Sequence, residues 1–376
     1  MLKVIFILLL AVVNVGTARA GPLEDGVAAQ GRGDYVTAVR IYRLAAEQGD
    51  AAAQYNLGLM YAQGQGVAQN YKQARFWFEK AAAQGVAQAQ FNLGTMYAQR
   101  QGVAQDYKQA FYWYEKAAAQ GFADAQFSLG VMYREGKGVV RDYKKAVYWY
   151  EKAAVQGFAP PHLSLGLMYE NGEGVAQDYK KAVYWYEKAA VRGYADAQVN
   201  LGLMYEKGQG VTQNYKQAMS WYEKAAAQGL AVAQHNLGEM YFRGQGVAPD
   251  YKQAISWYEK AAAQGDSQAQ HNLGVIYTEG KVVAQSYKQA VFWYEKAAAQ
   301  GYAVSQFNLG LMYGQGQGVP PDYVHAHMWL SLSAVLGNVD SVKYRDIFAK
   351  RMTPQQIAEA QKMARDCQQR NFKGCN

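Results

Sequence analysis

The sequence is poor in cysteine and proline, and it has no apolar run long enough to cross a membrane. Its 376 residues include only two Cys, which excludes a disulfide-dense scaffold and a multi-cysteine metal module. The longest apolar stretch, Val4 to Val15, falls short of the roughly 18 residues that a spanning helix needs. Hydrophobic residues make up 50% of the chain and aromatic residues 14%, which excludes wholesale disorder.

The first 20 residues have the features of an export signal. Lys3 gives a positive start, Val4 to Val15 an apolar segment, and Ala18-Arg19-Ala20 the small residues that a signal peptidase reads. No Cys stands near the cleavage point, so a lipid anchor is not expected, and the absence of any Asn-x-Ser/Thr acceptor fits a bacterial envelope. We therefore expect cleavage near Ala20 and a mature chain that is periplasmic or secreted and has no transmembrane segment.

A period of 36 residues runs through most of the chain. Leu-Gly pairs, Tyr and Trp all keep this step, and the Trp series accounts for all eight in the sequence: Trp77, Trp113, Trp149, Trp185, Trp221, Trp257, Trp293 and Trp329. A fixed period of about 20 to 50 residues indicates stacked supersecondary units rather than one globular core.

Each unit has the pattern of two helices. In 50–64 the apolar residues recur three or four apart, and the stretch ends at Gly64-Gln65-Gly66, where glycine can close a helix. Asn70 and its equivalents are all Asn, Asp or Ser, side chains that accept hydrogen bonds from the first turn of a second helix. Gly85 ends that second helix, and a glycine stands at the equivalent position of every later repeat.

These residues carry a family resemblance. Leu57-Gly58-x2-Tyr61 followed by Ala74-x3-Phe78-x2-Ala81 is similar to the tetratricopeptide signature, but the spacing between the two helices is longer. With Ala-x-Ala-Gln-x-Asn-Leu-Gly-x-Met-Tyr and a Gly-x-Gly-Val loop, the unit resembles the Sel-1-like repeat. The resemblance implies an all-α fold, a right-handed superhelical α/α solenoid.

The ends of the chain differ from the repeats and predict four segments: a signal peptide at 1–20, a degenerate N-terminal capping repeat at 21–49, eight repeats at 50–338 and a C-terminal helical cap at 339–376. Thr353-Pro354-Gln355-Gln356 predicts a capping box at the start of the last helix. Cys367 and Cys375 follow; in an exported protein a disulfide is favoured over two free thiols. Departures within the repeats are Arg100 and Val282, which each replace a loop Gly, and Pro160-Pro161-His162, which replaces Asp-Ala-Gln.

The sequence contains none of the common catalytic or phosphate-binding motifs. There is no Ser-x-x-Lys, Gly-x-Ser-x-Gly, His-Glu-x-x-His or phosphate-binding loop, so we predict no catalytic residue, no metal site and no cofactor. His235 and His271 occupy the same position in adjacent repeats, which leaves a metal or pH-sensitive site as the alternative to two polar groove residues. The net charge of +8 is spread along the chain beside Glu-Lys pairs, which favours a solvated face over an anion-binding ladder and argues against nucleic acid as a partner.

Variation between the copies points to a binding surface. Three positions of the first helix change freely, and they lie at i, i+4 and i+7, hence on one face. In tetratricopeptide-like solenoids this face lines the concave groove, so the resemblance implies a ligand surface with Phe91, Phe127 and Phe307 as anchors. Neighbouring Asn amides could hold a peptide backbone or, alternatively, bond within their own repeat. The predicted partner-binding residues are Tyr55, Phe91, Phe127, Leu163, His235, His271, Phe307, Asn56, Asn92, Asn200, Asn236, Asn272, Asn308, Arg134, Glu239 and Phe242.

The predicted function is that of an exported scaffold that binds a protein or peptide in this groove and assembles or regulates envelope complexes. The alternative is binding or hydrolysis of β-lactams or peptidoglycan fragments, an activity assigned to some secreted members of the family the chain resembles. Those members carry a Cys pair in each repeat, whereas these repeats carry none. A third interpretation is a spacer without a specific partner.

Overall fold

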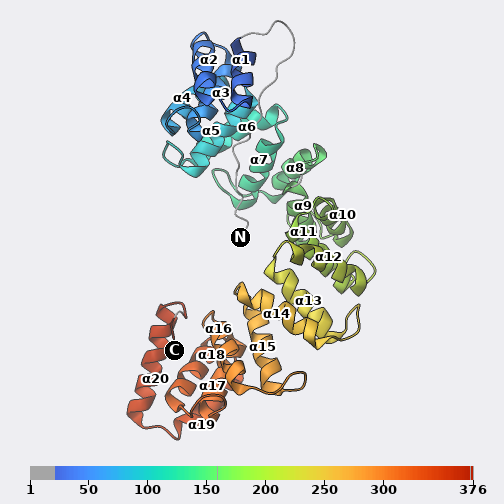
Figure 1. The fold of residues 1–376 in the computed structure, drawn as a ribbon, viewed down its shortest axis with the longest axis vertical. Coiled ribbons are helices and arrows are strands. Elements are labelled where there is room, and N and C mark those ends of the chain that lie inside the picture. Colours follow the sequence, from blue (N-terminus) through green and yellow to red (C-terminus); the bar gives the residue numbers. More distant parts are fainter. Residues whose placement is uncertain (1–21, 159, 373, 376) are drawn as a thin grey trace. The chain divides into compact units, whose positions relative to one another are not determined.

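The computed structural model of the chain describes residues 22–158, 160–372 and 374–375, and the predicted signal peptide lies outside them. All regular secondary structure in the described ranges is helical. The helices form two compact units, one ending at Arg192 and one beginning at Gly193, and each is described here by itself. Within each unit, helices consecutive in the chain pack as pairs (Figure 1).

The first unit contains ten helices among its described residues. They are α1 (Pro22–Gly31), α2 (Tyr35–Glu47), α3 (Ala51–Gln63), α4 (Tyr71–Ala83), α5 (Ala87–Gln99), α6 (Tyr107–Ala119), α7 (Ala123–Glu135), α8 (Tyr143–Val155), α9 (Pro160–Asn171) and α10 (Tyr179–Ala190).

The second unit contains the other ten. They are α11 (Ala195–Lys207), α12 (Tyr215–Ala227), α13 (Ala231–Arg243), α14 (Tyr251–Ala263), α15 (Ser267–Glu279), α16 (Tyr287–Ala298), α17 (Ala303–Gln315), α18 (Tyr323–Val335), α19 (Val339–Ala349) and α20 (Pro354–Gln369). From α3 to α18 we call the odd-numbered helix of each pair helix A and the even-numbered one helix B.

The predicted helix signals are confirmed. Asn70 Oδ1 accepts hydrogen bonds from the backbone N–H groups of Lys72 and Gln73, both at 3.1 Å, and every later helix B begins after an equivalent acceptor. Most helices A end at a left-handed glycine, such as Gly64 with φ of 70°. Arg100 adopts the same conformation with φ of 63°, although it is not a glycine.

Small residues let the two helices of a pair approach closely. A Cβ atom added to Gly130 in α7 would lie 2.4 Å from Cδ1 of Tyr150 in α8, so only glycine fits beneath that ring. Gly58 faces Phe78 in the same way, with 2.6 Å between the added Cβ and the ring. The core is therefore a series of aromatic rings from helices B laid on glycines of helices A.

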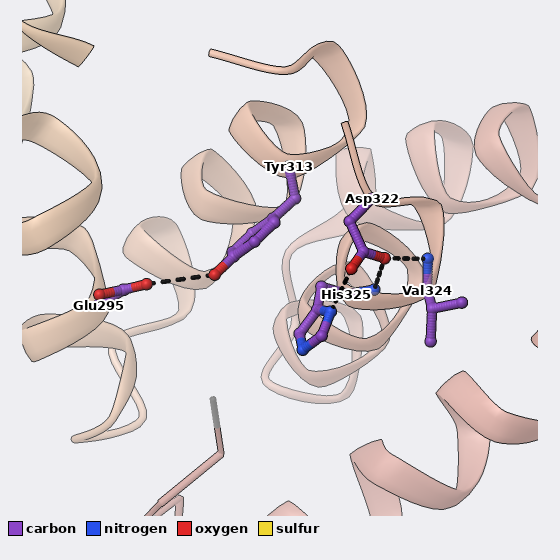
Figure 2. A network of polar contacts seen from close by, with 5 residues as sticks. All are labelled: Glu295, Tyr313, Asp322, Val324 and His325. Atoms are coloured by element: carbon purple, nitrogen blue, oxygen red, sulfur yellow. Dashed lines mark hydrogen bonds and ion pairs between the residues drawn. The ribbon is translucent and has the colours of Figure 1, made fainter. Parts of the chain in front are cut away.

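Successive pairs are joined by polar contacts as well. Figure 2 shows one such link in the second unit, where the Tyr313 hydroxyl in α17 donates to Glu295 Oε1 in α16 at 3.2 Å. Beside it, Asp322 accepts from the backbone N–H groups of Val324 and His325 and contacts His325 Nδ1 at 2.7 Å. The His325 ring in turn stacks on Tyr313 with 5.3 Å between centroids, so the start of α18 is tied to the preceding helix A.

The C-terminal segment covers the end of the array. In α19, the Phe348 ring lies where a side chain on Gly314 would sit, only 2.2 Å from an added Cβ. Helix α20 begins with the predicted capping box of Thr353 and Gln356 and packs against α18, where Trp329 is fully buried. Cys367 and Cys375 are bonded to each other and belong to the same buried cluster.

Candidate functional site

The structure buries the variable aromatic residues of helix A in the first unit, which the sequence assigned to a partner-binding groove. Tyr55, Phe91 and Phe127 are 0%, 2% and 4% exposed, and Leu163 is 4% exposed. The Phe91 ring lies 5.5 Å from that of Tyr114 in its own helix B and 5.3 Å from that of Phe122, which precedes the next helix A. These side chains are core residues and cannot contact a partner without rearrangement of the repeat.

Three further predicted residues are also inaccessible or covered. Asn56 and Asn92 are 3% and 1% exposed, so they cannot hold the backbone of a bound peptide. Phe307 is half-buried and its ring lies 5.7 Å from that of Tyr344 in α19. The cap helix thus occupies the face of Phe307 that the sequence assigned to a partner.

Four other predicted residues come together in the second unit. His235, Asn236, Glu239 and Asn272 line a polar hollow of ≈ 300 Å³ on the helix A side of this unit, from α11 to the start of α17. We call it the polar hollow; its remaining lining residues are Leu203, Glu206, Arg243, Gln245, Gln268 and Tyr302. Sequence reasoning missed Glu206 and Arg243, although Glu206 stands at the position of Arg134 and Phe242 and Arg243 lies four residues after Glu239.

Glu239 is the centre of the hydrogen-bond network in the polar hollow. Its Oε1 accepts from Asn272 Nδ2 at 2.7 Å and from the Tyr258 hydroxyl at 2.8 Å. Its Oε2 lies 2.7 Å from Arg243 Nε, whose side chain is 63% exposed. Burial and the nearby Glu239 carboxylate both raise the pKa of Tyr258, so this hydroxyl stays a donor. The network fixes the carboxylate and leaves the outer face of the guanidinium open to solvent.

Glu206 and Arg243 have hydrogen-bonding capacity to spare in the polar hollow. The Asn236 amide is buried beside the Tyr222 hydroxyl, so it serves its own repeat. Glu206 accepts from the Tyr222 hydroxyl through Oε2 at 2.6 Å, and a carboxylate can accept several further bonds. The exposed Arg243 guanidinium and the Glu206 carboxylate together suit the C=O and N–H groups of an extended peptide.

The two histidines do not form a joint site. His235 Nε2 lies 3.3 Å from Asn272 Nδ2, whereas His271 Nδ1 lies 2.9 Å from the buried Ser305 hydroxyl. Burial lowers the pKa of His271 to about 4, so its ring is neutral at physiological pH. Across the described ranges, no group of three or more His, Cys, Asp or Glu side chains is placed to hold a metal ion.

The other predicted residues lie elsewhere. Asn200 and Asn308 are half-buried in helices A of the second unit, and Arg134 in the first unit forms an ion pair with Glu173 at 3.2 Å. Phe242 lines a second, more apolar hollow of ≈ 320 Å³, together with Tyr251, Val275, Ile276, Glu279, Lys281 and Val282. This hollow lies where Val282 replaces a loop glycine.

Comparisons with known proteins agree with this architecture. The model of the Sel1 repeat matches nine consecutive segments: 18–50, 51–86, 87–122, 123–158, 162–194, 195–230, 231–266, 267–302 and 303–338. The first of them is the segment that the sequence predicted as a degenerate capping repeat. No curated protein matches the chain.

Two solved structures are similar over most of the chain. A Sel1 repeat protein from Oxalobacter formigenes shares 34% identity, with 88% of this chain and 96% of that one covered and a TM-score of 0.68. A protective antigen of uropathogenic Escherichia coli with an SLR fold also shares 34% identity, with 92% and 83% covered and a TM-score of 0.62. The chain belongs to the Sel1 repeat family and is an all-α solenoid with a period of about 36 residues.

Proposed function

We propose that the protein is an exported scaffold that binds a protein or peptide segment in the polar hollow and thereby assembles or regulates complexes of the cell envelope. Sel1 repeats typically serve protein interaction, which supports the general class. The observation that carries the proposal is the grouping of Glu206, Glu239 and the largely exposed Arg243 around one polar hollow. These groups offer a donor, acceptors and a cation within one site, the set that a polar peptide segment requires.

Export is part of this proposal. The bonded pair Cys367–Cys375 supports an oxidising compartment such as the periplasm or the exterior, because cytosolic thiols are kept reduced. No helix in the part of the chain that the structure describes is long and apolar enough to cross a membrane. The signal peptide predicted at 1–20 lies outside the described residues and is tested by sequencing the N-terminus of the exported protein.

Site-specific photocrosslinking tests the binding site. A photocrosslinking residue is placed at Arg243, in the hollow, and in a matched variant at Lys216, an exposed position of α12 that does not line it. Each variant is exposed to envelope extract of the source cell. We expect a distinct adduct from position 243 alone, and we expect Glu206→Gln, which keeps the shape of the side chain, to weaken it.

The outcomes separate the interpretations. Equal adducts from both positions, or none from position 243, would contradict binding in the polar hollow. A partner that crosslinks at 243 regardless of Glu206→Gln would show that the hollow is near the interface but that this carboxylate does not recognise the partner. If no protein is captured, peptidoglycan fragments are the next ligands to test.

The structure lends no support to the hydrolytic alternative. Ser305 contacts His271 at 2.9 Å, and Ser331 contacts His327 at 3.4 Å. Ser305 is 0% exposed and His327 is 4% exposed, so neither contact can act on a substrate as it stands. Turnover of a chromogenic β-lactam above background would revive this alternative.

A further inference from the structure

Helices B of the first unit expose an aromatic side chain in four successive repeats. Phe76, Tyr112, Tyr148 and Tyr184 are 44%, 45%, 49% and 50% exposed, and each directly precedes the conserved Trp of its repeat. We call these four residues the aromatic row. Single exposed apolar residues need no explanation, but a row of large rings at the same position of adjacent helices marks an interaction surface.

Each ring of the aromatic row is covered on one face by a lysine. The Lys four residues later places its ammonium 4.7 Å from the Phe76 centroid, 5.0 Å from Tyr112, 4.9 Å from Tyr148 and 5.3 Å from Tyr184; these are Lys80, Lys116, Lys152 and Lys188. The following Trp packs edge-on against the same ring, with centroids 4.9–5.1 Å apart. The row therefore presents partly exposed rings, each with a positive charge over one face.

Helices α8 and α10 extend this surface along their length. Val155 and Val191 lie seven residues after Tyr148 and Tyr184, on the same helix face, and are 85% and 70% exposed. Each of the two helices contains three Lys and one Glu, a net charge of 3 − 1 = +2. The surface is thus both apolar and basic, and the described residues of the first unit leave it exposed.

Helices α12 and α14 of the second unit provide an internal contrast, whereas α16 exposes Phe292 at the same position, with Lys296 4.9 Å from its centroid. Ser220 and Ser256 stand at the aromatic position in α12 and α14, and there Lys224 and Lys260 lie over Trp221 and Trp257 instead, both at 3.8 Å. These helices have the same length as α4, α6 and α8. Serine at this position is therefore compatible with the fold, and the aromatic row serves no obligatory packing role.

We propose that the aromatic row docks onto an anionic lipid surface. Tyr, Trp and Phe rings flanked by Lys suit the boundary between headgroups and acyl chains, where rings insert and ammonium groups stay at the phosphates. The basic charge of α8 and α10 complements anionic headgroups. A glycan or a single-stranded nucleic acid would instead stack on ring faces, and one face of each ring already holds a lysine ammonium group. The lipid contact is separate from the polar hollow, so the two proposals fail independently.

Vesicle flotation tests this proposal with the chain from Gly21 onward, which omits the apolar segment Val4 to Val15 that would itself enter lipid. The probes are vesicles of phosphatidylcholine alone and vesicles containing phosphatidylglycerol. We expect binding to the anionic vesicles only, weakening as salt is added. Replacing Phe76, Tyr112, Tyr148 and Tyr184 by Ser, as the chain itself does in α12 and α14, should abolish it while circular dichroism and the melting temperature stay near wild type.

A charge-matched pair of variants separates the surface from net charge. Lys152→Gln with Lys188→Gln should weaken binding about 30-fold, or about fivefold for each charge. Lys224→Gln with Lys260→Gln removes the same charge where the row is interrupted, and should have little effect. Equal loss from both pairs, no dependence on the serine variant, or no binding at all would each overturn the proposal. Serine-sensitive binding to a soluble polyanion such as heparin, without vesicle binding, would replace lipid by a glycan ligand.

Discussion

The Gln84 side chain donates a hydrogen bond from Nε2 to Oε1 of Gln54, at 2.8 Å. Gln54 is buried and uses its own Nε2 to donate to the backbone carbonyl of Ala46, at 3.1 Å. Gln54 thus joins the end of α2, its own helix A and the end of its own helix B. The same pair recurs as Gln120–Gln90, Gln156–Gln126, Gln228–Gln198, Gln264–Gln234 and Gln300–Gln270.

Two repeats lack this glutamine pair, and each case has a physical explanation. In the repeat of α9 and α10, His162 and Arg192 replace both glutamines together, and His162 Nδ1 lies 3.3 Å from Arg192 Nη1. In the last repeat only one partner changes: Leu336 stands where the second glutamine would be, and Gln306 Oε1 is buried without a hydrogen bond. Where both residues of the pair change together, the contact between them is retained. Where only one residue changes, an acceptor is left without a hydrogen bond.

Leu336→Gln should therefore stabilise the protein. The new amide can donate to Gln306 Oε1 as its equivalents do, a gain of about 1 kcal/mol in the free energy of unfolding. Chemical denaturation would measure the gain. Val335→Gln is the matched control, because Val335 is the neighbouring exposed residue and does not occupy the pairing position. A similar gain from the control would mean that surface polarity, and not the repaired pair, is responsible.

Stability should fall on acidification because of His271. Burial lowers the pKa of His271 to about 4 in the folded chain, whereas the unfolded value is about 6.5. Below pH 6.5 the unfolded state binds the additional proton, so this contribution is complete above that pH and is lost as the pH falls toward 4. The loss should approach about 3 kcal/mol at pH 4.

His271→Phe tests this assignment, since phenylalanine occupies the same position in three other repeats. The variant leaves the Ser305 hydroxyl without its partner and so lowers stability at every pH, but it should flatten the slope between pH 6.5 and 4. A smaller slope should remain, because burial also lowers the pKa of His327. Parallel curves of unfolding free energy against pH for variant and wild type would contradict the prediction.

Arg100→Gly should stabilise the first unit. Arg100 has φ of 63°, the left-handed conformation that glycine adopts at the equivalent end of helix A in other repeats. A non-glycine residue in this conformation costs about 1–2 kcal/mol, part of which glycine returns through its greater freedom in the unfolded chain. We expect a net gain of about 0.5–1 kcal/mol by thermal unfolding, and an unchanged or lower melting temperature would argue against strain at Arg100.

Loss of the Cys367–Cys375 bond should loosen the C-terminal cap. The bond closes a loop with a sequence separation of 8, which by chain entropy contributes about 2.5 kcal/mol. Adding a reductant should lower the temperature at which the cap unfolds. A Cys367→Ala, Cys375→Ala variant should be destabilised by a similar amount and should no longer respond to reductant. If the variant still responds, the effect of the reductant does not come from this bond.

Helix boundaries could be predicted from the sequence because single side chains set them. Asp106 caps α6 by bonding the backbone N–H groups of Lys108 and Gln109, and Gly136 ends α7 in the left-handed conformation. Both signals act within three residues of the boundary. No information about neighbouring repeats is needed to interpret them.

The burial of the variable residues could not be predicted in this way, because it depends on how the next repeat stacks. Phe91 lies against Phe122, and His271 lies against Tyr302, 5.2 Å between centroids; both second residues precede the next helix A. The variable residue thus packs against a residue of the next repeat that also varies. From the sequence alone, such variation resembles that of a ligand-binding surface. The polar hollow was only half predicted for the same reason, since Tyr302 reaches it from the next repeat.

The covering of the last repeat by α19 and α20 has a consequence for how such a chain changes in length. Phe348 occupies the space over Gly314, and α20 lies on α18, so no further pair can be added after α18 without displacing both helices. A duplication of 36 residues before the last repeat leaves these contacts intact. Relatives with more or fewer repeats should therefore keep similar terminal segments and differ by whole units in the interior of the gene.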